Sequence, residues 1–175
     1  KLGRRCIGRN LAARESEDAD LVWFTDTDYV FRGCLDRLLE LEWPSGASLI
    51  YPTSLRVHRD CEEGDVFLRQ WDGHVGLADM DVSDFIWTGY GKAIGGIQIV
   101  KGEFARRHGY LDDSRWQRPR MDGRMFGDFR DDVIYRRYVE RYGAIVPVSS
   151  IGEGLFRIRH TQKSYKNYQK TKRII

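Results

Sequence analysis

Two aspartates that follow an apolar segment constrain this chain more than any other feature. Residues 21–24 read Leu-Val-Trp-Phe, which is typical of a buried strand, and Asp26 and Asp28 come directly after it. Side chains two positions apart point to the same face of an extended chain, so the sequence predicts that the two carboxylates converge. Such oxygens suit Mg²⁺ or Mn²⁺, which in turn binds a diphosphate. The alternative is an acidic turn after a strand.

The composition indicates one folded domain. Of the 175 residues, 41% are hydrophobic and 13% are aromatic, which is enough for a sizeable core. A net charge of +3 permits a polyanionic partner or a membrane surface but requires neither. The three cysteines form no Cys-x-x-Cys pair, which excludes zinc ribbons and thioredoxin chemistry and favours reduced thiols. Reduced thiols are typical of a cytoplasmic protein, which is the location we expect, with association at a membrane surface left open. No apolar run approaches the roughly 20 residues that cross a bilayer.

Hydrophobic periodicity predicts helices that alternate with strands. In the clearest helix, Ile134, Tyr138 and Tyr142 lie on one side, and Gly143 follows its end. Residues 58–93 are polar and rich in glycine and give no clear pattern. The predicted helices cover residues 3–16, 33–42, 65–71, 102–108 and 131–142, and the predicted strands cover residues 21–25, 49–57, 93–100, 144–148 and 155–158.

This alternation is typical of an α/β domain. Some connections are too short for a crossover helix, so we expect a mixed β-sheet flanked by helices instead of a purely parallel one. We assign residues 1–162 to this domain. Residues 163–175 form a basic C-terminal tail with five basic residues and no acidic one.

Arg9, Asp131 and Asp132 are further candidate site residues. Arg9 lies on the first predicted helix, which would run back beside the strand, so its guanidinium could meet a phosphate or a base edge. The alternative is a solvated helical arginine. Asp131 and Asp132 begin a helix, where the helix dipole stabilises negative charge. Capping accounts for one of them, and the other is a candidate general base for a hydroxyl nucleophile.

His160 lies at the end of the last predicted strand, immediately before the basic tail. An imidazole there is a candidate third metal ligand or a phosphate contact. The alternative is an ordinary surface histidine.

Four segments in order carry a family resemblance. Cys-Ile-Gly-Arg9-Asn10-Leu-Ala-Ala resembles an Ala-Arg-Asn helix, and residues 20–28 resemble a strand with an Asp-x-Asp motif. Residues 94–100 and the following Gly-Tyr-Leu-Asp resemble a Gly-Gly strand and an acceptor-side turn, and Asp131-Asp132-Val133 resembles a Glu-Asp helix. Together they resemble a family-2-type glycosyltransferase of the GT-A fold, and the resemblance covers nearly the whole chain.

The resemblance implies roles for these residues. Asp28 would hold a Mn²⁺ or Mg²⁺ cofactor, and Asp26 would hold the metal or the ribose of a nucleotide-sugar donor. Asp132 aligns with the base of inverting members, but Asp131 stands where the family has Glu, which leaves open which of the two serves. Arg9 would lie near the nucleotide, and His160 resembles a C-terminal metal-binding histidine.

The resemblance has two departures. The family's first βαβ unit should precede Lys1, and residues 58–93 match no part of the family pattern. We therefore expect the chain to be an N-terminally truncated fragment that exposes an apolar strand edge and binds the donor poorly by itself.

The sequence therefore predicts a metal-dependent, inverting transfer of a sugar from a nucleotide-diphosphate sugar, such as a UDP-sugar, to a saccharide or other hydroxyl acceptor. A His ligand would also fit a retaining enzyme. One alternative is a nucleotidyltransferase that uses the same metal and diphosphate site. Another is a nucleic-acid-binding module that uses lysines interleaved with tyrosines in the tail. We prefer to interpret the tail as a disordered end or as a contact with anionic lipid headgroups, without a nucleic-acid partner.

Overall fold

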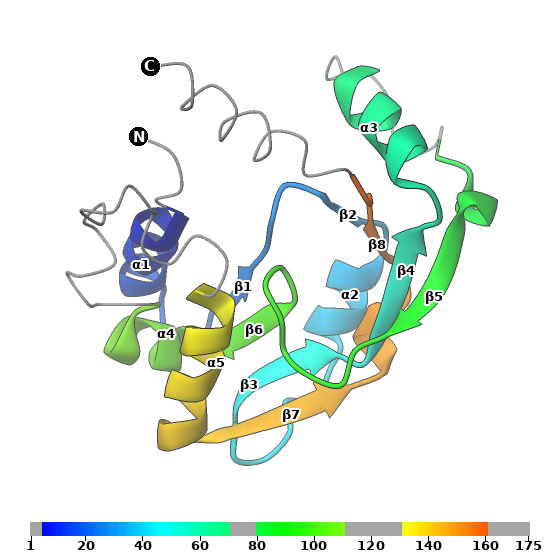
Figure 1. Cartoon of the computed structure of the whole chain (residues 1–175). Helices are drawn as coiled ribbons and strands as arrows, with labels where there is room; N and C mark the ends of the chain where they lie inside the picture. Colours follow the sequence, from blue (N-terminus) through cyan, green and yellow to red (C-terminus); the bar gives the residue numbers. More distant parts are fainter. Residues whose placement is uncertain (1–4, 71–79, 111–130, 161–175) are drawn as a thin grey trace, which may run out of the picture.

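The computed structural model describes residues 5–70, 80–110 and 131–160. Within these ranges the chain forms two four-stranded sheets, each with parallel and antiparallel pairs, and helices flank them (Figure 1). The expectation of a mixed α/β arrangement is therefore confirmed. The expected tail, residues 163–175, lies outside the described residues.

The first sheet has the strand order β1 (Leu21–Phe24), β6 (Gln98–Lys101), β3 (Ala47–Pro52) and β7 (Ala144–Val148). Strand β6 is antiparallel to both β1 and β3, and β3 is parallel to β7. Strands β1, β3 and β7 consequently run in one direction, and their carboxyl ends lie at the same edge of the sheet. Ligands of open α/β sheets bind at such an edge.

The second sheet has the strand order β2 (Tyr29–Phe31), β8 (Leu155–Arg157), β4 (Ser54–His58) and β5 (Phe85–Gly89). Strand β8 pairs antiparallel with β2 and parallel with β4, and β4 pairs antiparallel with β5. The chain passes from the first sheet to the second between β1 and β2, between β3 and β4, and between β7 and β8 (Figure 1).

Helices α1, α4 and α5 lie together beside the first sheet, whereas α3 stands beyond the end of the second (Figure 1). None of the helices in the described ranges is long and apolar enough to span a membrane. The helices are α1 (Arg5–Glu15), α2 (Cys34–Leu39), α3 (Cys61–Gln70), α4 (Gly102–His108) and α5 (Asp131–Tyr142), with 3-10 turns η2 (Val82–Asp84) and η4 (Ser150–Gly152).

An aromatic cluster fixes the carboxyl end of β1. The ring of Phe24 lies 4.7 Å from that of Tyr110 and 5.3 Å from that of Tyr135, measured between centroids. All three side chains are buried. Burial of such a side chain contributes roughly 1.5–3 kcal/mol, so this contact holds β1, the residues after α4, and α5 in a fixed arrangement.

The predicted strands differ from the structure in two places. The predicted strand 49–57 is divided at Thr53 into two strands, β3 and β4, which belong to different sheets. The predicted strand 93–100 begins only at Gln98, because Gly96 has a φ of 86°, which a strand does not accommodate. Strands β2 and β5 were not predicted as strands, since β2 is too short for a periodic signal and β5 lies in the polar segment 58–93.

Candidate functional site

The Asp-x-Asp motif lies in the turn that connects β1 to β2. Strand β1 ends at Phe24, and the backbone N–H of Tyr29 donates to the carbonyl of Asp26 at 3.3 Å. The extended geometry expected for these residues is therefore wrong, and strand alternation does not set the directions of the two carboxylates. Instead, each carboxylate pairs with a different arginine.

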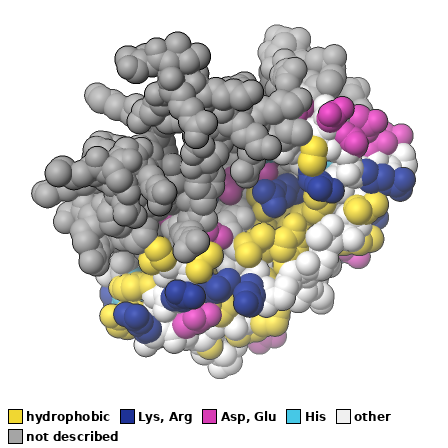
Figure 2. All heavy atoms as spheres, in the orientation of Figure 1, with side chains coloured by type: hydrophobic (Ala, Val, Ile, Leu, Met, Phe, Trp, Pro, Cys, Tyr) yellow, Lys and Arg dark blue, Asp and Glu magenta, His cyan; other side chains and the backbone are white. Residues whose placement is uncertain are grey.

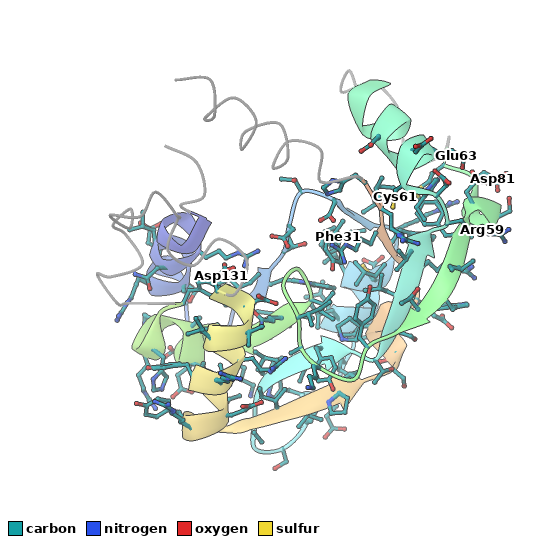
Figure 3. All side chains as sticks on the ribbon, viewed as in Figure 1. Phe31, Arg59, Cys61, Glu63, Asp81 and Asp131 are labelled. Atoms are coloured by element: carbon teal, nitrogen blue, oxygen red, sulfur yellow. The ribbon has the colours of Figure 1, made fainter. Side chains whose placement is uncertain are left out.

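One guanidinium binds two of the predicted acids. Arg9 Nη2 lies 2.7 Å from Asp26 Oδ1 and also donates to the carbonyl of Thr25. Arg9 Nη1 lies 3.4 Å from Asp131 Oδ2. In Figure 3, Asp131 lies at the end of α5 that is nearest to α1. We call Arg9, Asp26, Tyr110 and Asp131 the Arg9 cluster.

The Arg9 cluster is closed to solvent except at Asp26. The side chain of Arg9 is 10% exposed and that of Asp131 is 0% exposed, whereas that of Asp26 is 26% exposed. The hydroxyl of Tyr110 accepts from Arg9 Nη1 at 2.9 Å and donates to Asp131 Oδ2 at 3.1 Å, and its burial raises the pKa of Tyr110. Arg9 and Tyr110 together compensate the burial of the Asp131 side chain, because a buried carboxyl group needs such partners.

The second carboxylate lies in a more open cluster. Asp28 Oδ2 is 2.9 Å from Arg157 Nε, although the two residues are 129 positions apart, and 3.7 Å from His160 Nε2. Side-chain exposure is 9% for Asp28, 34% for Arg157 and 36% for His160. We call these three residues the Asp28 cluster. Two of them, Asp28 and His160, are predicted metal ligands.

Neighbouring aromatic residues hold Arg157 in place. Its guanidinium carbon lies 5.5 Å from the centre of the Tyr29 ring, and the side chain of Tyr90 is a further neighbour. Burial lowers the pKa of Arg157, but the nearby Tyr29 and Asp28 raise it by more, so the net shift is upward. Arg157 is therefore a fixed positive charge beside Asp28.

A glycine turn connects Asp132 to the Asp28 cluster. The N–H of Gly95 donates to Asp132 Oδ2 at 2.7 Å, and the carbonyl of Gly95 accepts from the Tyr29 hydroxyl at 3.2 Å. The carbonyl of Gly96 accepts from Trp23 Nε1 at 2.9 Å. A Cβ at Gly96 would overlap the ring of Tyr29. The Gly95–Gly96 turn thus packs against residues at the end of β1 and binds the first turn of α5.

A buried glutamine holds the backbone of the same helical turn. Gln98 is 0% exposed, and its Nε2 donates to the carbonyl of Asp132 at 2.9 Å and to that of Ala93 at 3.2 Å. The side chain of Asp132 is therefore positioned both through Gly95 and through its own backbone. Its second oxygen, Oδ1, accepts no hydrogen bond from the residues that the structure describes.

The chemistry of the Asp28 cluster fits a divalent cation. Within residues 5–70, 80–110 and 131–160, no group of three or more His, Cys, Asp or Glu side chains is arranged to hold a metal ion. A cation that binds a diphosphate needs fewer protein ligands, because phosphate and water oxygens complete its coordination. Asp28 and His160 supply an oxygen and a nitrogen donor, a combination that Mn²⁺ accepts.

Two acidic side chains outside these clusters, Asp60 and Asp81, have structural roles. Figure 2 shows acidic groups near the start of α3, where Figure 3 labels Glu63 and Asp81. In this region Asp60 accepts from the N–H groups of Glu62 and Glu63, and Asp81 accepts from the N–H of Ser83. These hydrogen bonds lower the pKa of Asp60 and of Asp81. Both aspartates are therefore helix caps.

A cleft of about 480 Å³ lies at the opposite edge of the first sheet. One of its residues, Lys101, pairs with Leu21, the first residue of β1. Aromatic and basic side chains line it, among them Trp43, Phe104 and Tyr142. None of the predicted site residues lines this cleft.

The structure divides the predicted site residues between two clusters. Arg9, Asp26 and Asp131 form one cluster, Asp28 and His160 belong to another, and Asp132 connects to the second through Gly95 and Tyr29. Sequence reasoning missed Arg157 as a site residue. Its signal was the alternation of apolar and basic residues at 156–159, which places alternate side chains on one face of a strand.

Comparisons of the chain with protein-family models, with curated proteins and with solved structures found no match.

Proposed function

We propose that this protein is a metal-dependent glycosyltransferase that moves a sugar from a nucleotide-diphosphate sugar to an acceptor hydroxyl. The observation that carries the proposal is the position of Asp28 3.7 Å from His160 at the carboxyl end of β1, with Arg157 on the same carboxylate. Carboxylate, imidazole and guanidinium groups together suit a diphosphate and its counter-cation.

Each residue of the proposed site would have a separate role. Asp28 and His160 would hold the Mn²⁺ or Mg²⁺ ion, and the exposed part of Arg157 would face the phosphates. A divalent cation bound there would neutralise charge on the departing nucleoside diphosphate. Arg9 and Asp26 would fix the turn between β1 and β2, because Arg9 also binds the carbonyl of Thr25.

Asp132 is the better candidate for the general base. Asp131 is fully buried and bonded to Tyr110, whereas Asp132 is only partly buried and its Oδ1 is without a hydrogen bond from the described residues. In the proposed reaction, the acceptor hydroxyl gives its proton to Asp132 and its oxygen attacks the anomeric carbon. The bond from that carbon to the diphosphate oxygen breaks, and the electron pair leaves with the nucleotide.

Direct binding tests the site. We would titrate Mn²⁺ and UDP into the full-length protein by calorimetry, compared with Asp28→Asn. Wild type should bind both, and UDP should tighten the binding of Mn²⁺. Asp28→Asn should weaken Mn²⁺ binding by at least about tenfold, because it removes an anionic ligand. Failure of wild type to bind either probe would end the proposal.

Turnover tests the base. Asp132→Asn should lower turnover by roughly 10²–10⁴ while UDP affinity changes little, since a base acts on the proton of the acceptor. Glu140→Gln is a matched control, because it removes an exposed carboxylate from the same helix. Unchanged turnover in Asp132→Asn would show that another group takes the proton.

A nucleotidyltransferase would use the same diphosphate chemistry. A panel of sugar nucleotides and plain nucleoside triphosphates distinguishes the two reactions by product. Release of pyrophosphate from a triphosphate, without sugar transfer, would favour the nucleotidyltransferase.

A further inference from the structure

We propose that Arg157 is an exchangeable counter-ion: it neutralises Asp28 when the site is empty and transfers to the diphosphate when cation and nucleotide bind together. This inference rests on the proposed function and adds a property to it. Cation and nucleotide would bind cooperatively because Arg157 and the cation compete for one carboxylate oxygen.

The first argument is that Arg157 occupies the Asp28 oxygen that faces His160, the oxygen through which both proposed ligands would share one cation. Arg157 Nε is 2.9 Å from Asp28 Oδ2, and His160 Nε2 approaches the same oxygen at 3.7 Å. A cation held by Asp28 and His160 would therefore meet Arg157 at that atom. Two positive charges on one oxygen repel, so the binding of either weakens the binding of the other.

The second argument is that Arg157 is held beside the site even without this ion pair. The ring of Tyr29 lies under its guanidinium at 5.5 Å from the guanidinium carbon, and the side chain of Tyr90 is a further neighbour. Its pairing with Tyr29 is anchored further by the hydroxyl of Tyr29, which bonds to Gly95. Arg157 can thus release Asp28 and still remain close enough to meet a ligand there.

The third argument is the number of donors. A guanidinium has five N–H groups in a planar fork, so contacts with Asp28 and Tyr90 leave donors for a phosphate. The side chain is 34% exposed, which gives a ligand access. A diphosphate would satisfy Arg157 in place of Asp28, and Asp28 would then be free for the cation.

The experiment measures coupling between two probes. Mn²⁺ affinity would be measured by electron paramagnetic resonance in the full-length protein, with and without UDP, for wild type and Arg157→Gln. In wild type, UDP should tighten Mn²⁺ binding about tenfold or more. In Arg157→Gln, Mn²⁺ alone should bind about tenfold more tightly than in wild type, and UDP alone should bind more weakly. The ratio of the Mn²⁺ affinities with and without UDP should fall towards one.

A matched control is Arg159→Gln, which removes the same charge from an exposed residue that donates to the carbonyl of Arg59 instead of to Asp28. It should leave both affinities within about twofold. If Arg157→Gln does not fold, as judged by circular dichroism, Arg157→Lys replaces it. Lysine keeps the charge but not the planar fork, so Mn²⁺ alone should bind several-fold more tightly and UDP binding should remain close to wild type.

The possible failures are distinguishable. If wild type binds Mn²⁺ and UDP but a folded Arg157 variant binds Mn²⁺ no more tightly, Arg157 is a structural partner of Asp28 and the exchange is wrong. If wild type binds neither probe, the proposed function fails and the exchange fails with it.

Discussion

The Arg9 cluster and the Asp28 cluster each contain one carboxylate of the Asp-x-Asp motif, and the partners of these two carboxylates differ in exposure. The side chains of Arg9 and Asp131 are 10% and 0% exposed, whereas those of Arg157 and His160 are 34% and 36% exposed. The motif residues show the reverse order, since Asp26 is 26% exposed and Asp28 is 9% exposed. Removing one partner of a buried ion pair destabilises the fold strongly, while a partly exposed partner can exchange its contacts with solvent or ligand. The exposure of the partners therefore sets the expected response of each cluster.

The largest expected effect is on the Arg9 cluster. Arg9→Met should lower the free energy of unfolding by roughly 3–5 kcal/mol, because it removes a cation that is bonded to the buried carboxylate of Asp131. Chemical denaturation would measure the loss. Arg37→Met is the control, since the pair of Arg37 with Glu153 is 48% and 58% exposed and should contribute less than about 1 kcal/mol. Equal losses in both variants would remove the distinction between buried and exposed pairs.

The next effect concerns the Gly95–Gly96 turn, which binds Asp132 and packs against Tyr29. Gly96→Ala should cost roughly 2–4 kcal/mol, since its φ of 86° disfavours a side chain and a Cβ would overlap the ring of Tyr29. Gly46→Ala is a matched control with a φ of 73° and open space around the new Cβ. It should cost only about 1–2 kcal/mol. Thermal unfolding of both variants would measure the difference, and a cost no larger at Gly96 would contradict the overlap.

Loss of a partner in the Asp28 cluster should affect ligand binding more than the stability of the fold. His160→Ala should change the free energy of unfolding by less than about 1 kcal/mol, because the side chain is 36% exposed. The same variant should weaken Mn²⁺ binding by about tenfold or more, since it removes the proposed nitrogen ligand. Calorimetry would measure both quantities. A strongly destabilised protein with unchanged Mn²⁺ affinity would assign His160 to the structure instead.

The smallest effect is expected at a histidine outside both clusters. Burial and the positive charges of Arg107 and Arg14 lower the pKa of His108 below its usual value of 6.5. His108 therefore binds a proton more readily in the unfolded chain than in the folded protein. Neutral His108 does not reduce the free energy of unfolding above pH 6.5, but below pH 6.5 the free energy of unfolding decreases as the pH falls. Thermal midpoints between pH 5 and 8 should fall less at acidic pH in His108→Gln than in wild type. Identical pH profiles would show that His108 does not contribute.

Local sequence patterns predicted most helices and the strands of the first sheet, but not β2 and β5, which are the edge strands of the second. Helix α4 covers residues 102–108 and α5 covers residues 131–142, as predicted, because glycine lies just beyond the end of each and α5 also has an apolar stripe. Strand β2 has only the residues Tyr29–Phe31, and its partner β8 lies at the far end of the chain. A strand of that length is specified by pairing, which a local pattern does not contain.

The candidate site was predictable in its residue types but not in its pairing. The carboxylates and His160 were identifiable because they lie at the ends of predicted strands or at the start of a predicted helix. The partition of Asp26 to Arg9 and Asp28 to Arg157 depends on long-range contacts. In the sequence, Arg157 resembles any basic residue of an amphipathic strand. Only the pairing of β8 with β2 brings it beside Asp28.

The four residues between β1 and β2 connect strands of different sheets while both of their aspartates are held by distant arginines. An insertion or deletion here would move one of the two carboxylates away from its arginine. Random indel libraries should therefore be depleted of variants in this connection, while the segment between α2 and β3, which carries no such double tether, should accept changes in length.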